Sequence, residues 1–161
     1  TIAAVNGAAV GAGFSLALAC DIRIAAEAAR FSAIFTKRAI VADTGCTWFL
    51  TRLIGPARAL EMLYTGRMVG AQEALTMGMV NEVVPNEGLM ARVDALARDI
   101  ARGPAIAIEL DKRLVQTAYD RSLDDQVVLE QFLQGYTQAS EDAVEGRRSF
   151  LEKREPVFRG R

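Results

Sequence analysis

Residues 3–27, "AAVNGAAVGAGFSLALACDIRIAAE", carry the pattern that decides the fold class. The apolar run at residues 2–5 predicts a buried strand that ends in a turn. Three small residues, 11–13, then precede an apolar run at 14–20 that predicts a helix. The alternation of apolar and polar residues over 21–27 predicts a second strand. The stretch is therefore typical of an α/β protein in which a glycine-rich turn joins a strand to a helix.

The composition is that of an ordinary globular protein, and it excludes several functional classes. Hydrophobic residues make up 51% of the 161-residue chain, and 19 basic against 20 acidic residues leave a net charge of −1. This balance gives no argument for nucleic-acid binding. Histidine is absent, which excludes Ser-His or Cys-His machinery and the usual zinc clusters supplied by this chain.

The cysteines and the apolar runs favour a cytoplasmic protein without a membrane partner. Cys20 and Cys46 lack C-x-x-C spacing, which favours reduced thiols over a disulfide framework. Asp21 and Arg23 interrupt the longest apolar run before it reaches membrane-spanning length. Because Thr1 leads directly into an apolar strand, and proteins rarely begin inside their core, we expect a fragment that lacks its N-terminal part.

The two halves of the chain differ in their predicted organisation. Strands and helices alternate up to Pro85, which predicts an α/β core over residues 1–85. Beyond it, apolar residues recur at helical spacing throughout residues 86–161. Ser122 and Ser140 stand where N-caps of the last two helices are expected.

The glycine-rich turn before the first helix is a candidate anion site. Backbone N–H groups at a helix N-terminus face outward and favour negative ligands. The spacing matches neither a dinucleotide-binding G-x-G-x-x-G motif nor a Walker loop. A tight turn that needs small residues only for packing is an equally good explanation.

Asp43, in "VADTGCTW" (residues 41–48), is a lone acid in an apolar stretch. An acid in a loop is usually a solvated surface group. Its neighbours Val41, Ala42 and Trp48, however, predict a dry site, which would suit proton transfer to and from carbon. This interpretation requires that the fold bring Asp43 to the glycine-rich turn.

Three ordered motifs resemble the crotonase superfamily, the enoyl-CoA hydratases and isomerases. They are "AAVNGAAVGAGFSLALACDIRIAAEAARFS" (3–32), "LTRLIGPARALEMLYTGRMVGAQEALTMGMVNEVVP" (50–85) and "EGRRSFLEKREPVFRGR" (145–161). The resemblance covers essentially the whole chain. Within the superfamily, the sequence is most similar to the epoxide isomerases of phenylacetyl-CoA breakdown and to Δ3,Δ2-enoyl-CoA isomerases.

The resemblance implies a spiral of strand-strand-helix units followed by a helical region, residues 86–161, that packs in trimers often paired as hexamers. It also implies an acyl-CoA substrate and no separate cofactor, because coenzyme A is part of the substrate. In the superfamily, an N-terminal part absent from this chain carries the first strands and one of two oxyanion donors.

The resemblance further assigns site residues. It places the second oxyanion donor on the backbone N–H of Ala12. Ser15 and Phe35 match the two glutamates with which hydratases handle water, and neither can act as a general acid or base in that way. Lys153 matches a position that can touch coenzyme A from a neighbouring subunit. The substrate-binding residues expected are Val10, Gly11, Gly13, Ser15, Ile34, Phe35, Gly45 and Lys153.

Asp43 matches the catalytic aspartate of isomerase members, within their "P-D-x-G-G-T-W" pattern. Ala42 replaces the proline of that pattern and Cys46 its second glycine. The sequence therefore predicts an isomerase that moves a double bond, or rearranges an epoxide or oxepin, with Asp43 as general acid/base. Two alternatives stay open: a hydratase that uses an acid outside this chain, and a non-catalytic oligomer that binds acyl-CoA.

Overall fold

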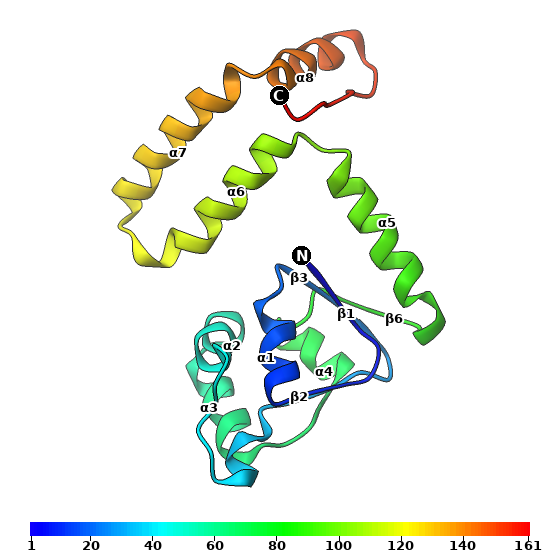
Figure 1. The fold of residues 1–161 in the computed structure, drawn as a ribbon, viewed down its shortest axis with the longest axis vertical. Helices are drawn as coiled ribbons and strands as arrows, with labels where there is room; N and C mark the ends of the chain where they lie inside the picture. The colour runs from blue at the N-terminus through cyan, green and yellow to red at the C-terminus, as the bar shows by residue number, and fades with distance from the viewer. The chain divides into compact units, whose positions relative to one another are not determined.

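A computed structural model describes residues 1–161, which divide into two compact units, Thr1–Ala97 and Arg98–Arg161. The first unit alternates short strands and helices, as predicted for the front half (Figure 1). Its elements are β1 (Ile2–Val5), β2 (Ala8–Val10), α1 (Ala12–Ala19), β3 (Ile22–Ala26), β4 (Arg30–Ser32), η1 (Ile34–Arg38), α2 (Cys46–Ile54), α3 (Pro56–Thr65), β5 (Val69–Gly70), α4 (Ala71–Thr76), β6 (Glu82–Val84), η2 (Asn86–Gly88) and α5 (Leu89–Ala101), whose last turn crosses into the second unit.

One sheet of the first unit is parallel, with strand order β1-β3-β6. Successive side chains of a strand point to opposite faces. Ile24 and Ala26 accordingly pack with Leu89 and Val93 of α5 on one face, whereas Ala25 belongs to the larger core that contains α1. β3 is therefore covered on both faces, which is typical of a strand in a parallel sheet.

The second sheet, β2-β4-β5, was not predicted. Its strands contain only two or three residues, and β2 pairs in parallel with β4 while β5 runs antiparallel to β4. β1 with β2, and β3 with β4, form two consecutive strand-strand units, each followed by helical structure. α1 thus starts directly at the end of β2, which fixes the place of the glycine-rich turn.

A buried arginine closes the C-terminal end of α1. The Nη1 of Arg23 donates to the carbonyl oxygens of Leu18 (3.1 Å) and Cys20 (2.6 Å), and its Nε donates to that of Met79 (2.8 Å). Burial lowers the pKa of Arg23, and the nearby Cys20 and Asp21 oppose that shift. These bonds satisfy carbonyl groups that a helix end leaves without partners. The sequence pattern gave no indication of this role.

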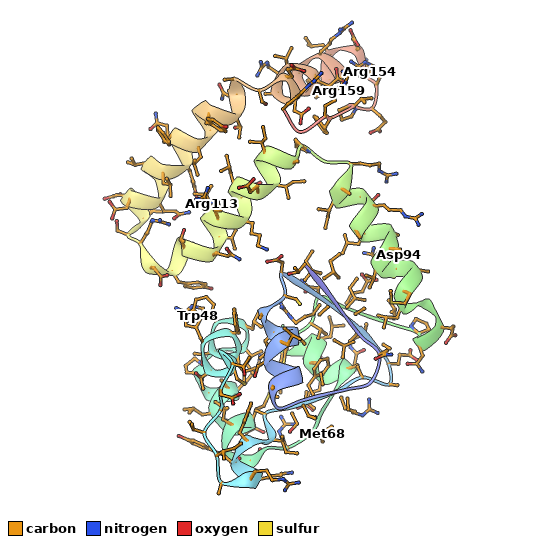
Figure 2. All side chains as sticks on the ribbon, in the orientation of Figure 1. Trp48, Met68, Asp94, Arg113, Arg154 and Arg159 are labelled. Carbon is orange, nitrogen blue, oxygen red and sulfur yellow. The ribbon has the colours of Figure 1, made fainter.

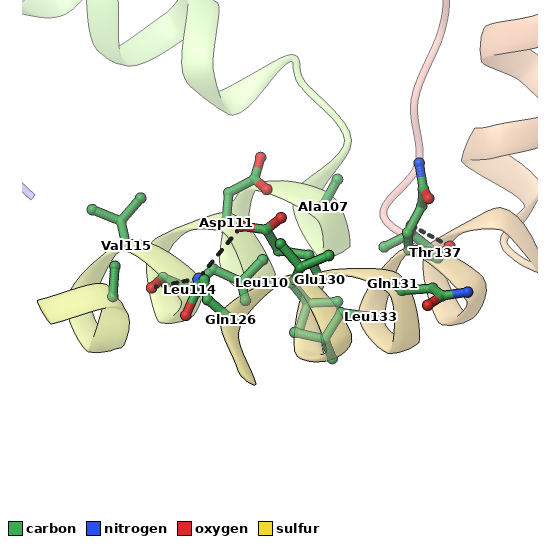
Figure 3. A pocket seen from close by; sticks show the side chains of 13 residues that line it. Ala107, Leu110, Asp111, Leu114, Val115, Gln126, Glu130, Gln131, Leu133 and Thr137 are labelled. Carbon is green, nitrogen blue, oxygen red and sulfur yellow. Dashed lines mark hydrogen bonds between the residues drawn. The ribbon is translucent and has the colours of Figure 1, made fainter. Parts of the chain in front are cut away.

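The second unit is helical and has little core of its own. None of the residues of α6 (Ala105–Thr117) or α7 (Leu123–Gln138) is buried. Between these helices lies a groove of about 930 Å³, into which the amide of Gln126 projects (Figure 3). The remaining elements are η3 (Ala118–Asp120) and α8 (Glu141–Glu152).

Both predicted N-caps of the second unit are confirmed. The hydroxyl of Ser122 accepts from the N–H of Asp125, and that of Ser140 accepts from the N–H of Ala143, each at 3.1 Å. The predicted domain boundary after Pro85 stays a prediction. No helix of the chain combines the length and the apolar character that a bilayer-spanning segment requires.

Replacing Arg23 by leucine should destabilise the first unit far more than replacing Arg30 by leucine. Arg30 also donates to two backbone carbonyls, but it lies exposed, so water can replace those bonds. Each buried carbonyl left without a donor costs roughly 1–3 kcal/mol. Denaturant unfolding measures the free energy of unfolding of both variants. Equal decreases in the two variants would show that the Arg23 hydrogen bonds stabilise the unit no more than the exposed bonds of Arg30.

Candidate active site

The N-terminus of α1 presents open N–H groups. Gly11 precedes the helix with φ 55° and ψ −128°, a conformation that favours glycine, and no side chain caps the helix. The first hydrogen bond of the helix runs from the N–H of Ser15 to the carbonyl of Gly11 at 3.0 Å. The N–H groups of Ala12, Gly13 and Phe14 donate no hydrogen bond within the chain. Ala12 and Gly13 are exposed, so this helix end can receive an oxygen that carries negative charge.

The walls around Gly11 come from β2 and η1. Val10, the last residue of β2, is partly exposed beside the turn. A Cβ atom on Gly11 would lie 3.7 Å from the Cγ2 of Ile34, so the backbone conformation, and not lack of space, calls for glycine here. Phe35 is buried in the core, where it packs instead of facing solvent.

Asp43 begins a tight turn with an unusual backbone. The N–H of Cys46 donates to the carbonyl of Asp43 at 3.0 Å. Thr44 and Gly45, the two central residues, have φ values of 54° and 75°, as in a type I′ turn. A β-branched residue at positive φ is strained, and such strain concentrates at functional sites. The hydroxyl of Thr44 donates to the carboxylate of Asp43 at 2.9 Å, a contact that the sequence did not reveal.

Gly45 is required by both its backbone and its surroundings. A Cβ atom there would lie 2.9 Å from the Cε2 of Phe49, closer than atoms can pack, and φ is positive. Gly45 also precedes α2, whose first residue is the buried Cys46. This glycine therefore fixes how the Asp43 turn enters the helix.

Ser15 joins the Asp43 turn to the start of α1. Its side chain is fully buried, and its hydroxyl lies 3.3 Å from the carbonyl oxygen of Gly11 and 3.2 Å from that of Asp43. Burial raises the pKa of the neighbouring Cys46 thiol, and the Ser15 hydroxyl opposes that rise. The structure thus brings Gly11, Ser15, Asp43 and Cys46 together, although 28 residues separate Ser15 from Asp43.

The expectation that neighbouring residues dry the Asp43 site is wrong for these 161 residues. Asp43 is exposed, Val41 is 83% exposed and Trp48 is 44% exposed. Trp48 projects outward from α2 (Figure 2), with the guanidinium of Arg52 3.8 Å from its ring centroid and Phe49 edge-on at 4.8 Å. Apolar residues near an acid in sequence therefore do not by themselves enclose it.

Lys153 lies in the second unit and ends α8 in a left-handed conformation, with φ 54°. It is exposed, and its ammonium group forms no ion pair within the chain. The neighbouring Arg154 binds both carboxylate oxygens of Glu145 and holds the pKa of that group down at about 2. Lys153 is thus presented between ion-paired neighbours as a cation still available to a ligand.

The Enoyl-CoA hydratase/isomerase family model matches residues 1–161 of this chain. The chain belongs to the enoyl-CoA hydratase/isomerase family. It is 44% identical over 160 residues to the "Probable enoyl-CoA hydratase" of Rhodobacter capsulatus, covering 99% of this chain and 62% of that protein. It is 41% identical to the 1,2-epoxyphenylacetyl-CoA isomerase of Escherichia coli K12, with 99% and 61% covered. The carnitinyl-CoA dehydratase of the same strain is 40% identical, with 99% and 63% covered.

Solved structures confirm the fold class. The enoyl-CoA hydratase of Bacillus anthracis superposes with a TM-score of 0.96 at 40% identity, over 99% of this chain and 62% of that one. The crotonase-type α/β fold with a C-terminal helical region, expected from the resemblance, is therefore correct. This family member spans about three fifths of the length of the relatives it matches. Their names include a hydratase, an isomerase and a dehydratase, so membership alone does not choose the reaction.

Gly45→Ala should destabilise the protein by roughly 1–2 kcal/mol, the usual cost of a left-handed conformation for a residue with a Cβ. Displacement of the Phe49 ring should add to that cost. Gly88→Ala is the matched control, because its Cβ would meet open space and its φ is not positive. Thermal unfolding of the two variants tests the assignment, which fails if Gly45→Ala is as stable as Gly88→Ala.

Proposed function

We propose that this chain carries the catalytic part of an acyl-CoA isomerase. Asp43 takes a proton from the carbon next to the thioester, and the electron pair moves into a dienolate. The N–H of Ala12 then stabilises the negative charge on the thioester oxygen, which is the largest single contribution in many such reactions. Asp43 returns the proton to a different carbon, so the double bond moves and no atom is gained or lost. The same two groups suit the rearrangement of an epoxide or oxepin thioester.

One observation carries this proposal: a single side chain, Ser15, touches both halves of the site. Its hydroxyl lies against the carbonyl of Gly11, which belongs to the same peptide group as the N–H of Ala12. It also lies against the carbonyl of Asp43. A general base must reach the substrate while the oxyanion rests on its donors, and closeness of the two backbones supports that requirement.

Isomerisation is favoured over water addition by the surroundings of two residues. Ser15 and Phe35, which match the glutamates of hydratases, are both buried in the core. Neither can hold or activate a water molecule above the α1 N-terminus. The hydratase alternative finds support in the names of several relatives, and it requires an acid from outside these residues. Water addition to crotonyl-CoA measures that alternative directly.

The roles of the other residues follow the same proposal. Gly11 and Gly13 keep the helix end open, and Val10, Ile34 and Gly45 flank the reacting carbons. We propose that Lys153 binds the phosphates of a coenzyme A molecule held by a neighbouring subunit, because its ammonium group is exposed and unpaired. No cofactor is proposed, since coenzyme A arrives as part of the substrate.

Asp43→Asn should lower isomerisation by roughly 10²–10⁴-fold, the usual contribution of a positioned base. Asparagine keeps the size of the side chain but cannot accept a proton from carbon. Solvent deuterium exchange next to the thioester should disappear in parallel, while acyl-CoA binding should persist. Turnover, exchange and binding assays on the full-length protein separate these effects. A variant that isomerises and exchanges at near-normal rates would reduce Asp43 to a structural residue.

We also propose that the second unit associates with other copies of this chain, in a trimer or a pair of trimers. Val128, Phe132 and Tyr136 recur every four residues along α7 and form one apolar stripe, and Phe132 is 73% exposed. Leu133 and Val127 line the groove toward α6 on another side of the same helix. α7 has no buried residue, and apolar residues on two of its sides favour a protein partner.

Phe132→Glu should weaken self-association, because it places a charge in the apolar stripe of α7. Tyr64→Glu on α3 is the matched control, since Tyr64 is an equally exposed aromatic residue, at 72%. Sedimentation velocity over a range of concentrations should show dissociation of the first variant only. A stable monomer of the unsubstituted protein at high concentration would contradict the association itself.

A further inference from the structure

The Asp43 turn has one hydrogen bond to a distant part of the fold. Within residues 41–44, the carbonyl of Asp43 accepts from the N–H of Cys46, which belongs to the adjoining α2, and from the hydroxyl of Ser15. The only other hydrogen bond of this segment is internal, from Thr44 to the Asp43 carboxylate. Ala42 packs against the core, but Val41 and Asp43 are exposed. The position of Asp43 relative to α1 therefore depends on Ser15 as far as hydrogen bonding is concerned.

The Ser15 hydroxyl is placed so that it can donate a hydrogen bond to the Asp43 turn. It is fully buried, so water does not compete for it. It has one proton to donate and lies within reach of two carbonyls, those of Gly11 and Asp43. The Gly11 carbonyl already accepts from the Ser15 N–H at 3.0 Å in the regular helical pattern. The Asp43 carbonyl lies on a separate segment, so the bond to it adds a long-range constraint that the helix does not supply.

We infer that Ser15 is a positioning residue, whose buried hydroxyl fixes the Asp43 carboxylate at the N-terminus of α1. This inference rests on the proposed function of Asp43 and adds to it how the base is held. Ser15 itself touches no reacting atom. At the position where hydratase members carry an acid, this chain would use a hydroxyl to hold an acid that stands elsewhere in the sequence.

Loss of the Ser15 hydroxyl should slow the chemical step and leave substrate binding unchanged. Misplacing a catalytic group by about 1 Å can lower the rate roughly 10²-fold even when the substrate still binds. Loss of the Ser15 hydroxyl should not prevent folding, because alanine is the best helix former. Both carbonyls also keep a backbone donor, the Ser15 N–H for Gly11 and the Cys46 N–H for Asp43.

The experiment compares Ser15→Ala with Ser32→Ala in the full-length protein. Ser32 is an equally buried serine, and its hydroxyl donates to the carbonyl of Gly66 at 3.0 Å, away from Asp43. Steady-state isomerisation of both variants is measured, and Ser15→Ala is also combined with Asp43→Asn. We expect Ser15→Ala to lower kcat roughly 10–10²-fold with KM unchanged. Ser32→Ala should keep its kcat, and Ser15→Ala should cause no further loss once Asp43 is asparagine.

Equal kcat values for the two serine variants would overturn the inference, because loss of the Ser15 hydroxyl would then affect catalysis no more than loss of a buried hydroxyl elsewhere. A Ser15→Ala effect that persists in full in the Asp43→Asn background would also overturn it, because Ser15 would act through a different group. Either result leaves the proposed function standing as long as Asp43→Asn alone is inactive. Near-normal turnover by Asp43→Asn alone would instead contradict the proposed function, and this inference with it.

Discussion

The open N-terminus of α1 is the constraint on which the rest of the first unit depends. A helix normally satisfies its first N–H groups with a side-chain cap, as Ser122 and Ser140 do in the second unit. Before α1 the chain instead uses Gly11, with φ 55° and ψ −128°, and no cap follows. Three donors are thereby left open at the end of a short strand. α1 shares the lack of a side-chain cap with α2, α3, α4 and α6, and it forgoes about 1 kcal/mol of stability at a helix end where an anionic ligand could take the place of the cap.

The two ends of α1 are treated in opposite ways. At its C-terminus, the buried Arg23 satisfies the Leu18 and Cys20 carbonyls and joins them to Met79. A cation there also suits the negative end of the helix dipole. The buried Ser15 fixes the other end from inside, through contacts with Gly11 and Asp43. A helix anchored at one end and braced from within can keep its remaining end open without fraying.

Local signals predicted the local features of this fold. The first helix after small residues and the serine caps of the last two helices each depend on neighbouring residues, and all are present. The strands of the second sheet escaped prediction because two or three residues show no alternation, and only pairing across the fold defines them. The roles of Arg23 and Ser15 escaped for a related reason. Their partners are carbonyl groups, which every residue has and no sequence pattern marks.

The prediction of a dry Asp43 site was wrong for an instructive reason. Hydrophobic neighbours of Asp43 in sequence are not neighbours around its carboxylate, because Val41 and Trp48 are exposed. Enclosure is a property of the assembled surface, so any cover over Asp43 has to come from groups other than these two side chains. Under the proposed function, these exposed apolar residues form a surface that an acyl group can cover.

One fold supports hydratases, isomerases and dehydratases among the relatives, so the reaction must be decided by a few side chains on a common frame. Under the proposed function, three positions make that decision in this chain. Phe35 and Ser15 remove the two groups that would handle water, and Asp43 supplies a single base that can take and return the same proton. Ser15 does more than leave an acid out, because its buried hydroxyl contacts the carbonyl of Asp43 and, as inferred above, holds the Asp43 turn at α1. An ionised glutamate at that position could donate to neither carbonyl, so the residue that would serve water addition could not also hold the Asp43 turn in this way.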